Sequence, residues 1–134
     1  MRPGRTLSVL ILSVSTVSCA ATTYDTSITA KPAPTTTVLP TGTAAVLLPQ
    51  LVTEASTLSS LIVGQGDKLA AVERIEALWA AVSAEVTGKD RDLATEIGAE
   101  VVKGRTAAVL DRPASADKVY RDLTALVKAY LASA

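Results

Sequence analysis

The chain has 134 residues, with 13 basic and 13 acidic side chains, one cysteine, one methionine and no histidine. This composition removes the imidazole base of nucleophilic triads, the usual zinc ligands, and the histidine and methionine ligands of haem and di-iron bundles. Phosphate-backbone binding needs a basic surface, and the balanced charge provides none. We therefore predict no enzyme, no cofactor and no nucleic-acid partner.

Residues 1–18 have the pattern of an export signal. Arg2 and Arg5 precede an apolar run of about a dozen residues that ends near Val17. A bilayer-spanning helix needs ~20 apolar residues, so this run is too short to cross a membrane. We predict a signal peptide that is removed and an extracytoplasmic location in the cell envelope. Its removal leaves 11 of the 13 basic residues, because Arg2 and Arg5 are lost, against 13 acidic ones.

The segment Thr16-Val17-Ser18-Cys19 resembles the lipobox of bacterial lipoproteins. The resemblance implies that the Cys19 thiol carries diacylglycerol, becomes the first mature residue and anchors the protein to the membrane. Two acyl chains hold a protein on a membrane far better than one. The segment departs from the family at Thr16, where a large aliphatic residue is usual. The alternative is ordinary secretory cleavage around Ser18-Cys19-Ala20, which releases a soluble secreted protein.

Residues 19–42 have the composition of a linker. Nine threonines and three prolines lie between Ala20 and Thr43, with few large apolar side chains. Such a stretch cannot bury enough surface to offset its ordering entropy, so we expect an extended, disordered tether. Residues 43–134 form the one folded domain.

Four amphipathic helical segments are predicted in this domain. The first covers 44–63 and contains Pro49, so it either begins near Leu48 or bends there. The second follows Asp67, a good N-cap, and ends at Thr87-Gly88. Their expected inward residues are Leu47, Leu48, Leu51, Ala55, Leu58, Leu61 and Ile62 in the first, and Leu69, Val72, Ile75, Trp79, Val82 and Val86 in the second.

The third segment is capped by Asp90 or Asp92, and Gly98 and Gly104 weaken it unless a neighbouring helix packs closely against them. The fourth follows Asp111-Arg112-Pro113, with Ser115 as its cap. The expected inward residues are Leu93, Ile97, Val101 and Ala108 in the third, and Ala116, Val119, Leu123, Leu126 and Tyr130 in the fourth.

The turns between these predicted segments are short, so successive helices have to run antiparallel. This predicts an all-α, up-down-up-down four-helix bundle. The alternative is a pair of helical hairpins that completes its core by forming a homo-oligomer.

Three acidic residues form one candidate site. Asp92, Glu96 and Glu100 stand at positions i, i+4 and i+8, where like charges oppose helix formation. Lys103, or basic residues of a neighbouring helix, would relieve the repulsion. Carboxylates suit a hard cation such as calcium, so these residues are metal candidates. The alternative is a solvated helix face.

Two short motifs have simpler interpretations. Ser115-Ala116-Asp117-Lys118 matches the Ser-x-x-Lys pattern of penicillin-binding enzymes, but the partner motifs are missing, and a helix cap explains the serine. Gly64-Gln65-Gly66 begins like a phosphate-binding loop, but it follows a predicted helix, and we expect a turn.

Two functions remain. The first is a non-catalytic interaction module that docks on an unknown envelope protein, with Trp79, Tyr120 and Tyr130 as anchors if they are exposed. The second is an accessory protein that binds a small ligand or metal ion for an uptake system. Arg112 to Lys118, before the last helix, is similar to helical extracytoplasmic domains found with bacterial iron-transport systems, although their histidine motifs are absent. A carboxylate catalyst would need two acids facing one another across a cleft.

Overall fold

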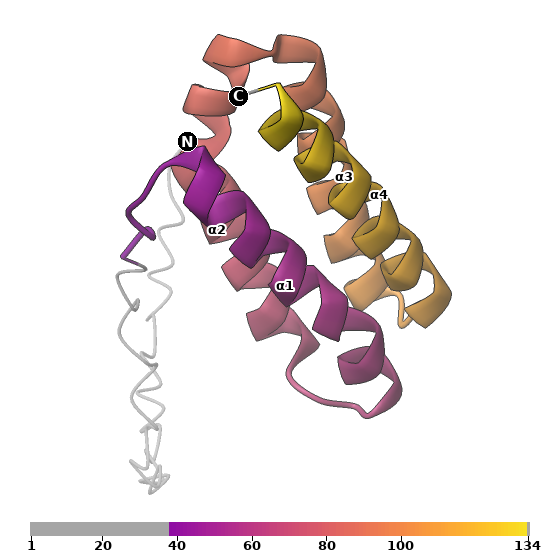
Figure 1. Cartoon of the computed structure of the whole chain (residues 1–134). Coiled ribbons are helices and arrows are strands. Elements are labelled where there is room, and N and C mark those ends of the chain that lie inside the picture. Colours follow the sequence, from indigo (N-terminus) through magenta and orange to yellow (C-terminus); the bar gives the residue numbers. More distant parts are fainter. Residues whose placement is uncertain (1–37, 134) are drawn as a thin grey trace, which may run out of the picture. The chain divides into compact units, whose positions relative to one another are not determined.

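The computed structural model describes residues 38–133, which contain four α-helices and no strand (Figure 1). They are α1 (Ala44–Val63), α2 (Lys68–Lys89), α3 (Arg91–Val109) and α4 (Pro113–Ala132). Each helix packs against two neighbours: α1 and α3 each pack against α2 and α4. Helices α1 and α3, which lie diagonally opposite one another, make only a weak contact. The predicted all-α four-helix bundle is confirmed. The predicted signal peptide, the lipidation residue Cys19 and most of the linker lie outside the described residues.

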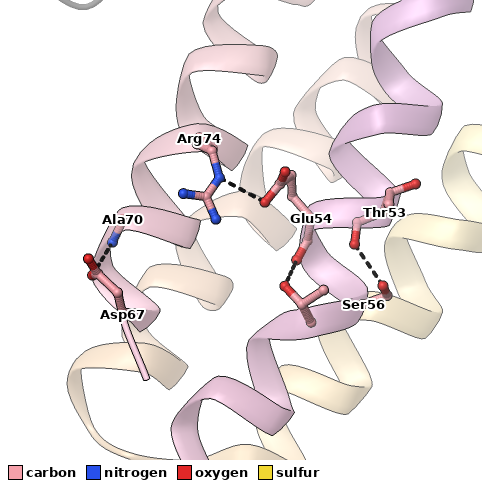
Figure 2. A network of polar contacts seen from close by, with 7 residues as sticks. Thr53, Glu54, Ser56, Asp67, Ala70 and Arg74 are labelled. Carbon is pink, nitrogen blue, oxygen red and sulfur yellow. Dashed lines mark hydrogen bonds and ion pairs between the residues drawn. The ribbon is translucent and has the colours of Figure 1, made fainter. Parts of the chain in front are cut away.

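Polar contacts connect neighbouring helices of the bundle. Arg74 of α2 donates to Glu54 of α1 at 2.9 Å, and Figure 2 shows the two side chains bridging the helices. Arg105 of α3 makes two hydrogen bonds to the Glu76 carboxylate of α2. This fork lowers the pKa of Glu76, because the ionised carboxylate accepts both bonds.

The core is aliphatic. Its largest completely buried side chains come from all four helices: Leu48, Leu51, Leu58, Val72, Val82, Val86, Ile97 and Leu123. A smaller cluster, with Leu58, Ile62 and Val72, is completed by four alanines: Ala71, Ala107, Ala108 and Ala116. Small side chains let helix backbones approach one another, so the bundle is tight where these alanines lie.

Gly104 lies at such a close approach. It is buried, and a Cβ built on it would lie 3.6 Å from Val119 Cγ1 of α4 and 3.9 Å from Leu58 Cδ2 of α1. A Cβ on Gly98 would lie 3.5 Å from Trp79 Nε1 of α2. Both glycines were expected to be tolerated only where a neighbouring helix packs closely against them. This close packing is confirmed.

Helix α1 begins at Ala44 and not near Leu48, so Pro49 lies in its second turn. The Thr43 side chain caps nothing; instead the Ala44 amide donates to Glu85 Oε2 of α2 at 2.8 Å. This contact satisfies one of the amide groups that a first helical turn leaves free. Among the described helices α1 alone is long and apolar enough to cross a membrane, at a mean hydropathy of 1.4, but core helices of globular proteins have the same character.

The caps of α2 and α3 are confirmed. Asp67 accepts from the Ala70 amide at 3.0 Å (Figure 2), and Asp90 accepts from the Leu93 amide at 3.0 Å. Helix α2 continues through Gly88 to Lys89, so Asp90 alone connects it to α3. The predicted Ser115 cap is wrong. Helix α4 starts at Pro113, two residues before Ser115, because proline has the backbone angle of a first helical position.

The predicted inward faces need five corrections, of which the first is Leu61 of α1, which is half-buried. Leu69 is exposed, because it lies in the first turn of α2 at the end of the bundle, and Trp79, Leu93 and Leu126 are half-buried. The fully buried positions beside them are Leu78, Ala94 and Val127. The prediction assigned large side chains such as Leu93 and Leu126 to the core, whereas the smaller Ala94 and Val127 are the ones buried there.

Candidate functional site

One end of the bundle carries exposed apolar side chains. We call it the turn end; it comprises residues 61–69, which join α1 to α2, and 107–113, which join α3 to α4. Val63 is 71% exposed and Val109 is 59% exposed, and Leu69 and Leu110 are also exposed. Exposed aliphatic side chains grouped in this way are typical of interaction surfaces.

The two turns lie beside each other. Lys68, at the start of α2, pairs with Asp111 of the other turn. A groove of about 560 Å³ runs between them, lined by Ile62, Val63, Gln65, Lys68, Asp111 and Pro113. The groove is open and mixed in character, which suits a protein surface better than a small enclosed ligand.

Both turns have the same backbone form. The Gly66 amide donates to the Leu61 carbonyl at 2.8 Å, and the Arg112 amide donates to the Ala107 carbonyl at 2.9 Å. These are Schellman motifs, in which one residue takes the left-handed conformation. Here it is Gln65, with φ of 53°, and Asp111, with φ of 52°, and neither is glycine. Residues Gly64-Gln65-Gly66 thus form a turn, as predicted, with its strain at the position that usually takes glycine.

A second site lies between α3 and α4. This α3–α4 pocket has a volume of about 240 Å³ and is lined by Glu100, Lys103, Thr106, Ala107, Arg112, Ser115, Lys118 and Val119. Glu100 is only 7% exposed. Its Oε1 accepts from Lys103 Nζ at 2.5 Å, whereas its Oε2 is buried and has no hydrogen-bond partner.

Charges of both signs surround this pocket. The hydrogen bond to Glu100 raises the pKa of Lys103, and the charge of Asp122 adds to the rise. Lys118 donates to Asp122 Oδ2 at 2.6 Å, which lowers the pKa of Asp122. Arg112 has no ion-pair partner within residues 38–133. The first turn of α4, which follows Arg112, has no side-chain cap.

The three predicted acidic residues do not act together. Asp92 and Glu96 are exposed, whereas Glu100 is buried against α4. A step of four residues advances the direction of the side chain by about 40°, so Glu100 points about 80° away from Asp92. Within the described residues no three Asp, Glu, His or Cys side chains come together as a metal site. The relief by Lys103 is confirmed, through its pair with Glu100.

The three aromatic candidates differ in exposure. Tyr130 is 3% exposed, belongs to the core and has Lys89 Nζ 4.5 Å from its ring centroid, so it cannot anchor a partner. Burial, with a smaller contribution from Glu85, raises the pKa of Tyr130. Trp79 is half-buried against the core, and Tyr120, 37% exposed, is the most accessible of the three.

The Ser-x-x-Lys motif forms no catalytic pair. Lys118 donates to Asp122, and no hydrogen bond joins it to Ser115. The turn end was not predicted from the sequence. The sequence did contain a sign of this surface, because the apolar residues that flank the predicted turns are Val63, Leu69, Val109 and Leu110.

The chain has no significant match among protein-family models, curated proteins or solved structures. The fold defines it as an all-α four-helix bundle with two candidate surfaces, the turn end and the α3–α4 pocket.

Proposed function

We propose that this chain is a membrane-tethered extracytoplasmic lipoprotein that acts as a non-catalytic docking module in the cell envelope. Diacylglycerol on Cys19 anchors it, residues 19–42 act as a tether, and the bundle binds another envelope protein through the turn end. The lipobox-like sequence supports the anchor, and the threonine- and proline-rich composition supports the tether.

The observation that carries the docking proposal is the group of exposed apolar residues at the turn end. Val63, Leu69, Val109 and Leu110 come from both turns, and the Lys68–Asp111 pair holds the turns beside each other. Exposed aliphatic side chains add nothing to the stability of an isolated bundle, but they release water when a partner covers them. The left-handed Gln65 and Asp111 add local strain, which is common at functional positions.

The place where the chain enters the bundle also supports this proposal. Helix α1 starts at the opposite end, where the Ala44 amide meets Glu85 near the end of α2 (Figure 1). With 20 residues at 1.5 Å each, α1 carries the chain about 30 Å from that point to the turn end. The turn end is thus separated from Ala44, where the bundle begins, by the length of α1.

The test is photo-crosslinking in intact envelopes. The photoreactive residue p-benzoylphenylalanine replaces Val63, Leu69 or Leu110 in the full chain, one at a time. The matched control places it at Arg91, an exposed residue at the α2–α3 connection. We expect the three turn-end positions to capture the same protein and the control to capture none. Capture of lipid alone, or equal capture from Arg91, would contradict docking by the turn end.

The second candidate function is binding of a small ligand as an accessory protein of an uptake system. One observation favours it: the α3–α4 pocket of about 240 Å³, whose lining includes the largely buried Glu100. A metal ion is not favoured there, because Glu100 is the one carboxylate in the lining and three cationic side chains accompany it.

A further inference from the structure

We propose that this chain forms a homodimer through the outer face of α1, in which the two α1 helices pack in parallel about a two-fold axis. This inference goes beyond the proposed function and does not depend on docking by the turn end. Four observations lead to it: the lack of charge on this face, its satisfied hydroxyl groups, its seven-residue spacing and the charges on its two flanks.

The outer face of α1 carries no charge. Its exposed residues are Ala45, Val46, Pro49, Gln50, Thr53, Ser56, Thr57, Ser60 and Val63. The one charged residue of the helix, Glu54, is half-buried and pairs with Arg74 of α2. Each of the other described helices exposes charged side chains. A two-fold contact sets residues near the axis beside their own copies, so a charged face would repel itself, whereas this face meets a second copy without repulsion.

The exposed hydroxyl groups of α1 are already satisfied by the helix itself. Thr53 donates to the Pro49 carbonyl at 3.0 Å, and Ser56 donates to the Thr53 carbonyl at 2.7 Å (Figure 2). Thr57 and Ser60 donate to carbonyls of the same helix at 2.9 Å and 2.7 Å. Because a donor that loses its water without a partner destabilises a contact, these internal bonds allow the face to be covered without leaving a hydroxyl donor unpaired.

The outer residues repeat at the spacing of two packed helices. Val46, Thr53 and Ser60 are seven residues apart, and Pro49 and Ser56 stand three residues after the first two of them. A seven-residue repeat keeps one line of side chains toward a partner helix, and in a parallel pair each of these residues lies at the level of its own copy. Their small size lets the two helices approach closely.

The flanks of α1 carry opposite charges. On the α4 side, the exposed Lys128 lines a groove of about 270 Å³ between α4 and α1. Within the part of the chain that the structure describes, Lys128 forms no ion pair. On the α2 side, the exposed Glu85 accepts from the Ala44 amide through Oε2 alone, which leaves Oε1 for a second partner.

These two charges lie at similar levels, which selects the parallel arrangement. Helices α2 and α4 both start at the turn end, and Glu85 and Lys128 each stand four residues before the end of their helix. With the two-fold axis along α1, the α4 flank of each copy faces the α2 flank of the other, so Lys128 of one copy faces Glu85 of the other. An antiparallel contact would instead bring each flank against its own copy. Such charge pairs select an orientation more than they add affinity.

The size of the face fits a reversible dimer. Helix α1 has 20 residues and is about 30 Å long at 1.5 Å per residue. A strip of that length and ~20 Å wide, which includes the adjoining edges of α2 and α4, buries ~600 Å² on each copy, and ~1,200 Å² in total is the lower end for specific interfaces. Exposed Val38 and Leu39 on the α2 flank and Leu131 on the α4 flank add apolar surface. A membrane is a poorer occupant, because the face lacks the basic and aromatic residues of interfacial helices.

The test is cysteine crosslinking of the full chain in intact cells with a short bis-maleimide. Val46→Cys, Thr53→Cys and Ser60→Cys are compared one at a time with the wild type, which measures the contribution of Cys19. The matched control is Val102→Cys, at an exposed valine of α3, the helix diagonally opposite α1. We expect each α1 variant to give at least fivefold more product of twice the chain mass than the control or the wild type.

Two second substitutions test the interface itself. Thr53→Asp in the Val46→Cys chain places two like charges at the axis and should lower the yield of dimer at least fivefold. Lys128→Glu in the same chain should lower it at least threefold, and thermal melts verify that both variants remain folded. Equal crosslinking of Val102→Cys, no product from the α1 variants, or products of another mass would overturn the homodimer. Crosslinking at Thr53→Cys alone would overturn the parallel arrangement. A failure of turn-end photo-crosslinking changes none of these outcomes.

Discussion

Replacement of Gly104 by alanine should stabilise the bundle. Glycine in a helix interior is worth up to ~1 kcal/mol less than alanine, because it loses more backbone freedom on folding. The added Cβ would lie 3.6 Å from Val119 Cγ1 and 3.9 Å from Leu58 Cδ2, which are ordinary van der Waals contacts. The methyl group therefore fits without moving a helix, and we expect the free energy of unfolding to rise by ~1 kcal/mol. For a domain of this size that raises Tm by about 4–8 °C.

Leucine at the same position should have the opposite effect. Its additional carbons would have to enter space that Val119 and Leu58 already fill, and overpacking of this kind costs ~1–3 kcal/mol. The matched control is Gly88→Ala in α2, where no atom lies within 4 Å of the new Cβ and helix propensity acts alone. Urea unfolding followed by circular dichroism measures all three variants. Destabilisation by Gly104→Ala would show that a methyl group has no room at this position, and tolerance of Gly104→Leu would refute the close approach of α3 to α1 and α4.

Three further outcomes are expected. Glu100→Leu should raise the free energy of unfolding by ~1–3 kcal/mol, since it removes a buried unpartnered oxygen and leaves Lys103 in solvent; a loss of stability in urea would show that the carboxylate supports the fold. Folding lowers the pKa of Glu76 below its ordinary 4.5, so the stability that the ionised carboxylate contributes is present above pH 4.5 and is lost as the pH falls further. Chemical denaturation at pH 3 to 7 should show this loss, and Glu76→Gln should make the loss smaller. Trp79→Ala should cost ~2–3 kcal/mol in urea, less than a fully buried tryptophan, because its ring is half-buried; a cost above ~4 kcal/mol would contradict that burial.

The helices could be predicted closely because their signals are local. Asp67 and Asp90 act as caps through their own side chains, and the first helix has the bounds 44–63 that its periodicity predicts. Pro49 suggested that the helix begins near Leu48 or bends there, and the later start is not observed. It is accommodated inside α1, whose first turn is stabilised at Ala44 by the distant Glu85, and no local rule anticipates that contact.

The candidate sites were harder to predict because they depend on packing between helices. A spacing of i, i+4 and i+8 placed Asp92, Glu96 and Glu100 on one edge, but helix rotation buries only Glu100 against α4. The unpartnered Oε2 follows from that burial, and the sequence carries no sign of it. The exposed Val63 and Leu110 could have been recognised beside their turns, but only the fold brings the two turns to the same end.

The measurement that tests the central claim most directly is intact mass spectrometry of the protein extracted from membranes. A tethered lipoprotein predicts a chain that starts at Cys19, without residues 1–18, and carries the added mass of diacylglycerol on that sulfur. Cys19→Ser should remove this mass and release the bundle from the membrane fraction. A retained Met1, or an unmodified Cys19 thiol on material from the soluble fraction, would contradict the account.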